Sequence, residues 1–124
     1  MMESLHIEAT DDTPKISFNP QNGMMEISSR SLPENAGAFY DKVNNWFKVY
    51  LNHAHEKTTV KFHFDYISTS SAKQLIQLFN SLNQLAKSKK VDILWCYDQG
   101  DSDMLQTGQR LQKLSEVEFQ YQEI

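Results

Sequence analysis

An alternation of apolar and polar side chains between Thr58 and Tyr66 constrains the fold more than any other feature of this sequence. Val60, Phe62 and Phe64 fall at every second position, and the residues between them are Thr59, Lys61, His63 and Asp65. Successive side chains of a strand point to opposite faces, so the stretch predicts a strand with one apolar face, which includes Tyr66. A central parallel strand covered on both faces would be apolar throughout. We therefore expect helices mainly on one face of the sheet.

The residues before this strand predict three short strands and a helix. The strands are expected at Leu5–Glu8, Lys15–Asn19 and Met24–Ser28, with turn-forming residues between them. The second and third should form a hairpin that turns one apolar face inward, made of Ile16, Phe18, Met25 and Ile27. Ser31 and Glu34 have the spacing of a capping box, and Pro33 suits a first helical turn. The apolar stripe of this helix is Phe39, Val43, Trp46, Phe47, Tyr50 and Leu51.

The residues after the alternating strand continue the pattern of helix and strand. A helix is expected at Ser70–Ser88, a strand at Val91–Tyr97, a helix at Asp101–Leu114 and a strand at Glu118–Gln122. The stripe of the first of these helices is Leu75, Ile76, Phe79, Leu82, Leu85 and Ala86. The order βββαβαβαβ predicts an α/β fold with a mixed sheet, in which the later strands are parallel neighbours. We expect one domain over residues 1–124.

Composition excludes several functional classes. The chain has 124 residues and a formal net charge of −4, and its basic residues are scattered, which does not favour nucleic-acid binding. Cys96 is the only cysteine, so no disulfide or thiolate zinc site is expected. No apolar run approaches the roughly 20 residues of a membrane span, and the first ten residues do not resemble a signal peptide. We expect a cytoplasmic protein without a cofactor.

Four consecutive hydroxyl residues, Ser68, Thr69, Ser70 and Ser71, join the alternating strand to the next helix. In α/β sheets, functional sites collect beyond the carboxyl ends of the strands. One hydroxyl can cap the helix, and a phosphate added nearby would meet free N–H groups, with Lys73 one turn further on. A serine-rich cap without further role would also account for the run.

The acidic residues Asp98, Asp101 and Asp103 follow the strand that ends at Tyr97. We expect Asp101 to cap the following helix and the other two to be solvated, because the loop lacks the pattern of a calcium hand. Since the loop should lie at the same sheet edge as Thr69, Asp98 and Asp101 are candidates for the surroundings of Thr69 and for partner binding. No recognisable catalytic constellation is present, so we do not expect an enzyme.

Several segments together resemble a known family over nearly the whole chain. They are Thr13-Pro14, Ser31-Leu32-Pro33-Glu34-Asn35, Phe39-Tyr40, Trp46, Tyr66-Ile67-Ser68-Thr69-Ser70-Ser71, Trp95-Cys96-Tyr97-Asp98, Asp103-Met104 and Gly108. In order and spacing they are similar to the SiaC family of bacterial regulatory phosphoproteins. The resemblance implies a fold like the STAS domains of anti-sigma-factor antagonists.

The resemblance also implies a function. The phosphorylated threonine of the family's Asn-Thr-Ser-Ser segment corresponds to Thr69, and Ser68 stands where the family usually has asparagine. It implies a serine/threonine kinase and a PP2C-type phosphatase as partners. It further implies that the unphosphorylated form binds and activates a diguanylate cyclase, raising cyclic-di-GMP and favouring aggregation or biofilm. The alternative is a small anion-binding, ligand-binding or hydrolytic α/β protein that uses the helix start at residues 69–73.

Overall fold

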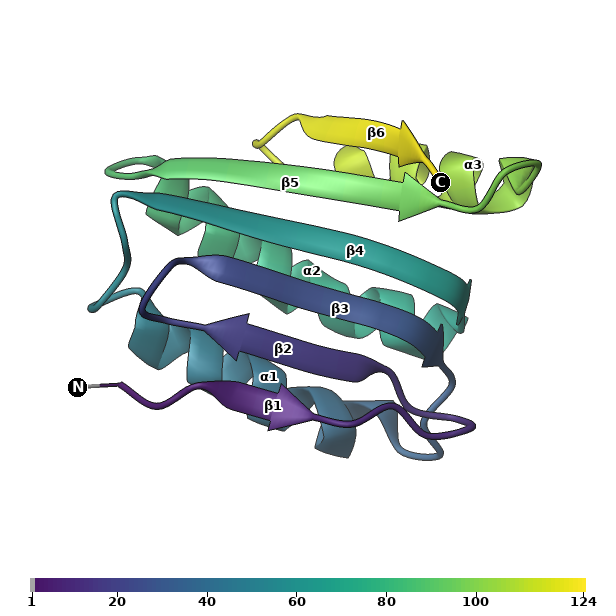
Figure 1. Cartoon of the computed structure of the whole chain (residues 1–124), viewed down its shortest axis with the longest axis horizontal. Coiled ribbons are helices and arrows are strands. Elements are labelled where there is room, and N and C mark those ends of the chain that lie inside the picture. Colours follow the sequence, from purple (N-terminus) through teal and green to yellow (C-terminus); the bar gives the residue numbers. More distant parts are fainter. Residues whose placement is uncertain (1) are drawn as a thin grey trace.

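The computed structural model describes residues 2–124, which form a six-stranded mixed sheet and three helices (Figure 1). The strands are β1 Leu5–Ile7, β2 Lys15–Asn19, β3 Met24–Ser31, β4 Lys57–Ile67, β5 Lys90–Tyr97 and β6 Phe119–Glu123. The helices are α1 Ala36–Tyr50, α2 Thr69–Ala86 and α3 Ser102–Gln112. This is the predicted order βββαβαβαβ, and it confirms the α/β fold class.

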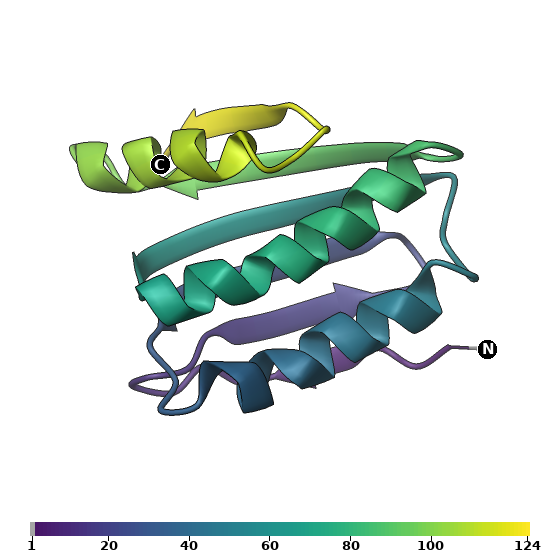
Figure 2. The same ribbon diagram turned by 180° about the vertical axis from the view of Figure 1, so that it is seen from behind.

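The strands lie in the sheet in the order in which they occur along the chain, from β1 to β6. The two pairs that β2 forms are antiparallel, whereas β3 with β4, β4 with β5, and β5 with β6 are parallel. All three helices cover the same face of the sheet, and Figure 2 shows them in front of it. The predicted one-sided arrangement is confirmed.

The core lies between this face of the sheet and the helices. The predicted hairpin is confirmed, because Ile16 pairs with Ile27 and Phe18 with Met25, and all four side chains are buried. Aromatic rings from several elements pack beside them, with Trp95 stacked against Phe119. Burial of such side chains supplies most of the stabilisation of a domain of this size.

The predicted apolar stripes of α1 and α2 need correction. In α2 the side chain of Ile76 is 36% exposed and Ala86 is exposed, whereas Leu78 is buried. Helix α2 packs against α1 as well as the sheet, and this rotates its buried face toward Leu78. In α1 the stripe residues Phe39 and Trp46 are only partly buried, whereas Tyr40, an aromatic residue that the prediction omits, is fully buried.

The predicted start of α1 at Ser31 is wrong. Strand β3 continues to Ser31, and the helix is capped by Asn35, whose side chain accepts a hydrogen bond from the N–H of Ala38. Pro33 therefore lies in the connection and not in a helical turn. The hydroxyl of Ser31 is buried in the interior, where it has partners from other elements, so it is not available for a capping box.

The alternation of β4 also ends earlier than predicted. The parallel register pairs Ser29 with Phe64 but Arg30 with Tyr66, so Asp65 is an extra residue on β4. Ser29 has a φ of 79°, in the left-handed region. The extra residue places Tyr66 outside the core, 44% exposed, with the guanidinium carbon of Arg30 5.2 Å from its ring centroid. The prediction that Tyr66 shares the apolar face of β4 is wrong.

Candidate functional site at the start of helix α2

The hydroxyl run spans the end of β4 and the first turn of α2. Ser68 is the N-cap of α2, and its side-chain oxygen accepts a hydrogen bond from the N–H of Ser71 over 3.1 Å. The N-cap residue satisfies one of the N–H groups that have no partner within the helix. One member of the run therefore caps the helix, as predicted.

Ser71 belongs to the interior. Its hydroxyl lies 2.8 Å from that of Ser31 and 3.0 Å from that of Ser68, and the Ser31 hydroxyl lies 2.6 Å from the phenol oxygen of Tyr40. We call Tyr40, Ser31, Ser71 and Ser68 the buried hydroxyl chain. It connects α1, the end of β3 and the start of α2. Each hydroxyl has at least one partner, as burial requires.

Tyr40 shows that the buried hydroxyl chain is shielded from water. Burial of its phenol raises the pKa of Tyr40 from 10.0 to about 12, and hydrogen bonds with Ser31 and Ser71 offset only part of that rise. The phenol therefore remains protonated at neutral pH and keeps its hydrogen bond to the interior serines.

Thr69 and Ser70 are the two exposed members of the run. Thr69 lies beside a depression of about 360 Å³ that has α2 on one side and α3 on the other. The α3 side of this depression, which we call the α2–α3 depression, is formed by Thr107, Arg110 and Leu111. Ser70 instead lines a groove of about 630 Å³ between the starts of α1 and α2. Two adjacent hydroxyls thus face two different surroundings.

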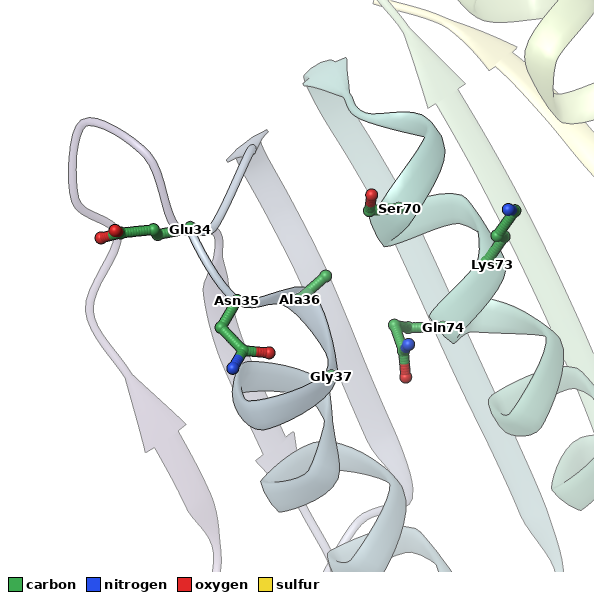
Figure 3. A pocket seen from close by; sticks show the side chains of 7 residues that line it. All are labelled: Glu34, Asn35, Ala36, Gly37, Ser70, Lys73 and Gln74. Atoms are coloured by element: carbon green, nitrogen blue, oxygen red, sulfur yellow. The ribbon is translucent and has the colours of Figure 1, made fainter.

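The groove beside Ser70 contains charged side chains that do not converge (Figure 3). Glu34 extends away from α2, and Lys73 projects from the side of α2 that is turned away from α1. Asn35 and Gln74 face each other across the groove. An anion held here would need several donors aimed at one point, which this arrangement does not provide.

Each of the two predicted aspartates makes a hydrogen bond of its own. Asp101 caps α3, as predicted, by accepting a hydrogen bond from the N–H of Met104 over 3.0 Å. Asp98 is solvated, as predicted, with its side chain 54% exposed. Its carboxylate also lies 2.9 Å from a ring nitrogen of His63, whose strand β4 lies beside β5 in the sheet. Neither aspartate lines the α2–α3 depression.

Four further residues belong to this site, and the sequence analysis did not predict them. Ser31 and Tyr40 complete the buried hydroxyl chain, and Thr107 and Arg110 line the α2–α3 depression. Thr107 and Arg110 are three positions apart on one helix, so the sequence could have shown them as neighbours. Their proximity to Thr69 depends on how α3 lies on the sheet, and no local pattern reports that.

Other chemistry is sparse. Cys96 is buried, and burial raises the pKa of its thiol. Among residues 2–124, no group of three or more histidine, cysteine, aspartate or glutamate side chains is arranged to hold a metal ion. Nor does any helix within the described part of the chain combine the length and apolar character that a membrane crossing needs.

These features define a small α/β domain with helices on one face of its sheet and an exposed threonine at a strand-to-helix junction. A family model described as "SiaC family regulatory phosphoprotein" matches residues 7–124, and the chain belongs to this family. The predicted resemblance is thereby confirmed. A search of curated proteins found no match.

Solved structures show the same fold. SiaC of Pseudomonas aeruginosa superimposes with a TM-score of 0.88 at 23% identity, covering 99% of this chain and 100% of that chain. Apo-SiaC from the same organism gives 0.88 at 24% identity, over 98% and 99% of the two chains. A third match, with a TM-score of 0.90 at 23% identity over 97% and 99%, comes from the crystal structure of diguanylate cyclase SiaD in complex with its activator SiaC.

Proposed function

We propose that this chain is a regulator that binds a partner protein, and that phosphorylation of Thr69 switches this binding. The observation that carries the proposal is the division of the hydroxyl run. Ser68 and Ser71 are buried and hydrogen-bonded, whereas Thr69 is exposed at the first position of α2. A kinase can therefore reach Thr69 without disturbing the core.

The chemistry at Thr69 is a simple group transfer. The hydroxyl oxygen attacks the γ-phosphorus of ATP and loses its proton, and ADP leaves; a phosphatase reverses the change by hydrolysis. The phosphate adds a charge of about −1.5 to −2 at pH 7. The first turn of α2 contains no acidic residue, so the new charge meets the positive end of the helix dipole without local repulsion.

The proposed partners rest on the resemblance to the family. The solved complex of diguanylate cyclase SiaD with its activator SiaC supports a diguanylate cyclase as the target, and we propose that the unphosphorylated form binds it. We further propose a serine/threonine kinase that modifies Thr69 and a PP2C-type phosphatase that restores it. In this scheme the chain has no catalytic role of its own, and its output is a change in cyclic-di-GMP synthesis that controls biofilm formation in a bacterium.

The position of Thr69 on the surface explains how a single phosphate could prevent docking. A partner that covers the start of α2 would have to bury a dianion, which is costly unless the partner supplies opposite charge. The sequence alternative, an anion-binding or hydrolytic protein using residues 69–73, has less support, because the charged groups near Ser70 do not converge (Figure 3).

The test compares two adjacent positions. We expect Thr69→Glu to weaken binding to the cyclase encoded in the same genome by at least about tenfold, or 1.4 kcal/mol, whereas Thr69→Ala binds like the wild type. Ser70→Glu is the matched control and should have a smaller effect, since Ser70 faces the groove beside α1. Isothermal titration calorimetry measures the affinities, and cyclic-di-GMP production measures activation.

Mass spectrometry of the native protein tests the modification itself. We expect a phosphate that maps to Thr69 and that a PP2C phosphatase removes. Equal affinities for wild type, Thr69→Ala and Thr69→Glu, together with no phosphate on Thr69 under several growth conditions, would contradict the proposed switch.

A further inference from the structure

The α2–α3 depression beside Thr69 holds one arginine. Arg110 lies on the opposite side of this depression from Thr69 and is exposed. Its Nη2 donates a hydrogen bond to Thr107 Oγ1 over 3.3 Å. Within residues 2–124, no carboxylate lies within ion-pair distance of its guanidinium group. Most of its N–H donors are therefore available to a new acceptor.

The depression persists because α3 does not pack closely on α2. Helix α3 lies against β4, β5 and β6, while α2 packs with α1 and with β5 (Figure 2). Space therefore remains between the first turn of α2 and the last turns of α3, and side chains from both helices line it. Because Thr69 lines this space, a group attached to its side chain has room beside the helix.

Given the proposed function, we propose that Arg110 binds the phosphate of phosphorylated Thr69, so that the modification connects α2 to α3. A guanidinium group matches a phosphate through two parallel N–H···O bonds, and such charge-assisted pairs are among the stronger hydrogen bonds in proteins. The ligand is a phosphate monoester dianion carried by the chain itself.

Lys73 is the competing cation. It is one helical turn after Thr69 and projects from the side of α2 turned away from α1, although it borders the groove beside Ser70 and does not line the α2–α3 depression (Figure 3). A phosphate that turned toward Lys73 would remain on α2 and leave α3 unchanged. The choice between Arg110 and Lys73 therefore decides whether phosphorylation changes one helix or connects two.

The connection has a consequence for recognition. A partner that contacts both the start of α2 and the exposed side of α3 would meet a changed surface on both helices. The phosphate charge would also be partly neutralised by Arg110, so the effect of phosphorylation would include loss of a free arginine as well as gain of negative charge.

The experiment installs phosphothreonine at position 69 of the full chain by genetic code expansion, so it does not depend on a cellular kinase. Phosphorus-31 NMR then follows the second ionisation of the phosphate against pH in the wild type and in three variants. Arg110→Gln removes the proposed partner, Lys73→Gln removes the competitor, and Arg30→Gln is the matched control on β3. An opposite charge in contact lowers the pKa of an acidic group by about one unit or more.

We expect the phosphate pKa to rise by about one unit in Arg110→Gln, and to stay at the wild-type value in Arg30→Gln. A smaller rise in Lys73→Gln than in Arg110→Gln also supports the proposal. No rise in Arg110→Gln, or a larger rise in Lys73→Gln, overturns it. Either result leaves the phosphorylation switch standing, since that depends on the partner affinities and on the mapping of the native phosphate.

Discussion

The two sides of the first turn of α2 are built differently. Toward α1, the helices pack together and the buried hydroxyl chain joins them in the interior, while a groove remains between their starts. Toward α3, the helices are separated by the α2–α3 depression, which Thr69 and Arg110 line. The four consecutive hydroxyl residues therefore have different roles. Position around the helix, and not residue type, divides the run into hydroxyls that hold the fold together and hydroxyls that are available for chemistry.

The largest expected effect comes from the α3 side. A Cβ at Gly108 would lie 2.5 Å from Trp95 Cδ1 and Nε1, and the ring is fixed by a 3.0 Å hydrogen bond from Nε1 to the Met104 carbonyl. We expect Gly108→Ala to lower the free energy of unfolding by about 3 kcal/mol, because α3 must move away from β5. Urea unfolding measures the loss.

Gly37→Ala is the matched control for this change. An added Cβ there meets nothing closer than 3.6 Å, and alanine is a better helix former than glycine. We expect unchanged or slightly higher stability. If both substitutions cost the same, the close approach of α3 to Trp95 does not explain the effect.

The next effect concerns the α1 side and depends on pH. The pKa of Tyr40 is raised to about 12 in the folded state, above its ordinary value of 10.0, so folding favours the protonated phenol. This contribution to stability is fully present below pH 10 and is lost as the pH rises toward 12. The rise in the pKa of Tyr40 from 10.0 to about 12 corresponds to about 2–3 kcal/mol in the free energy of unfolding.

Tyr40→Phe isolates this contribution. At pH 8 it should cost about 1 kcal/mol, because one buried hydrogen bond is lost. Between pH 10 and 12 the wild type should lose stability relative to this variant. Tyr66→Phe, at a side chain 44% exposed, is the control and should keep the wild-type pH dependence. If the stabilities of wild type and Tyr40→Phe depend on pH in the same way, the phenol is not shielded from water.

The smallest effects compare neighbouring serines directly. Ser71→Ala leaves the hydroxyls of Ser31 and Ser68 each without one partner in a buried site, and we expect a cost of about 1–2 kcal/mol. Ser70→Ala changes an exposed side chain, and we expect a change within about 0.5 kcal/mol. Thermal unfolding of the two variants measures both losses of stability. A larger cost at Ser70 would reverse the division of the run.

The fold could be predicted from the sequence to the extent that its signals are local. The alternation in β4 and the 3.6-residue stripes in α1 and α2 place the elements, and the polar face of β4 predicts helices on one side. The start of α1 could not be predicted, because the partner of Ser31 is Ser71, forty positions away. A capping-box spacing is satisfied locally whether or not the serine is needed elsewhere.

The site was predicted in part for the same reason. A capping role within the hydroxyl run follows from residue type, and Ser68 fulfils it. That Ser71 is buried while Ser70 is exposed depends on where α1 packs, and the position of Arg110 depends on where α3 lies. These relations depend on how distant elements pack together, and the periodicity of the sequence does not predict such packing.

The extra residue on β4 shifts by one position which residue occupies each structural position after the strand. If β4 continued in regular register past Asp65, each later residue would occupy the next structural position. Ile67 would then fall at the capping position and Ser68 at the first exposed position of α2. The bulge restores a serine to the cap and a threonine to the surface. One unpaired residue therefore decides whether the secondary alcohol of a threonine or the primary alcohol of a serine is exposed at the first position of α2.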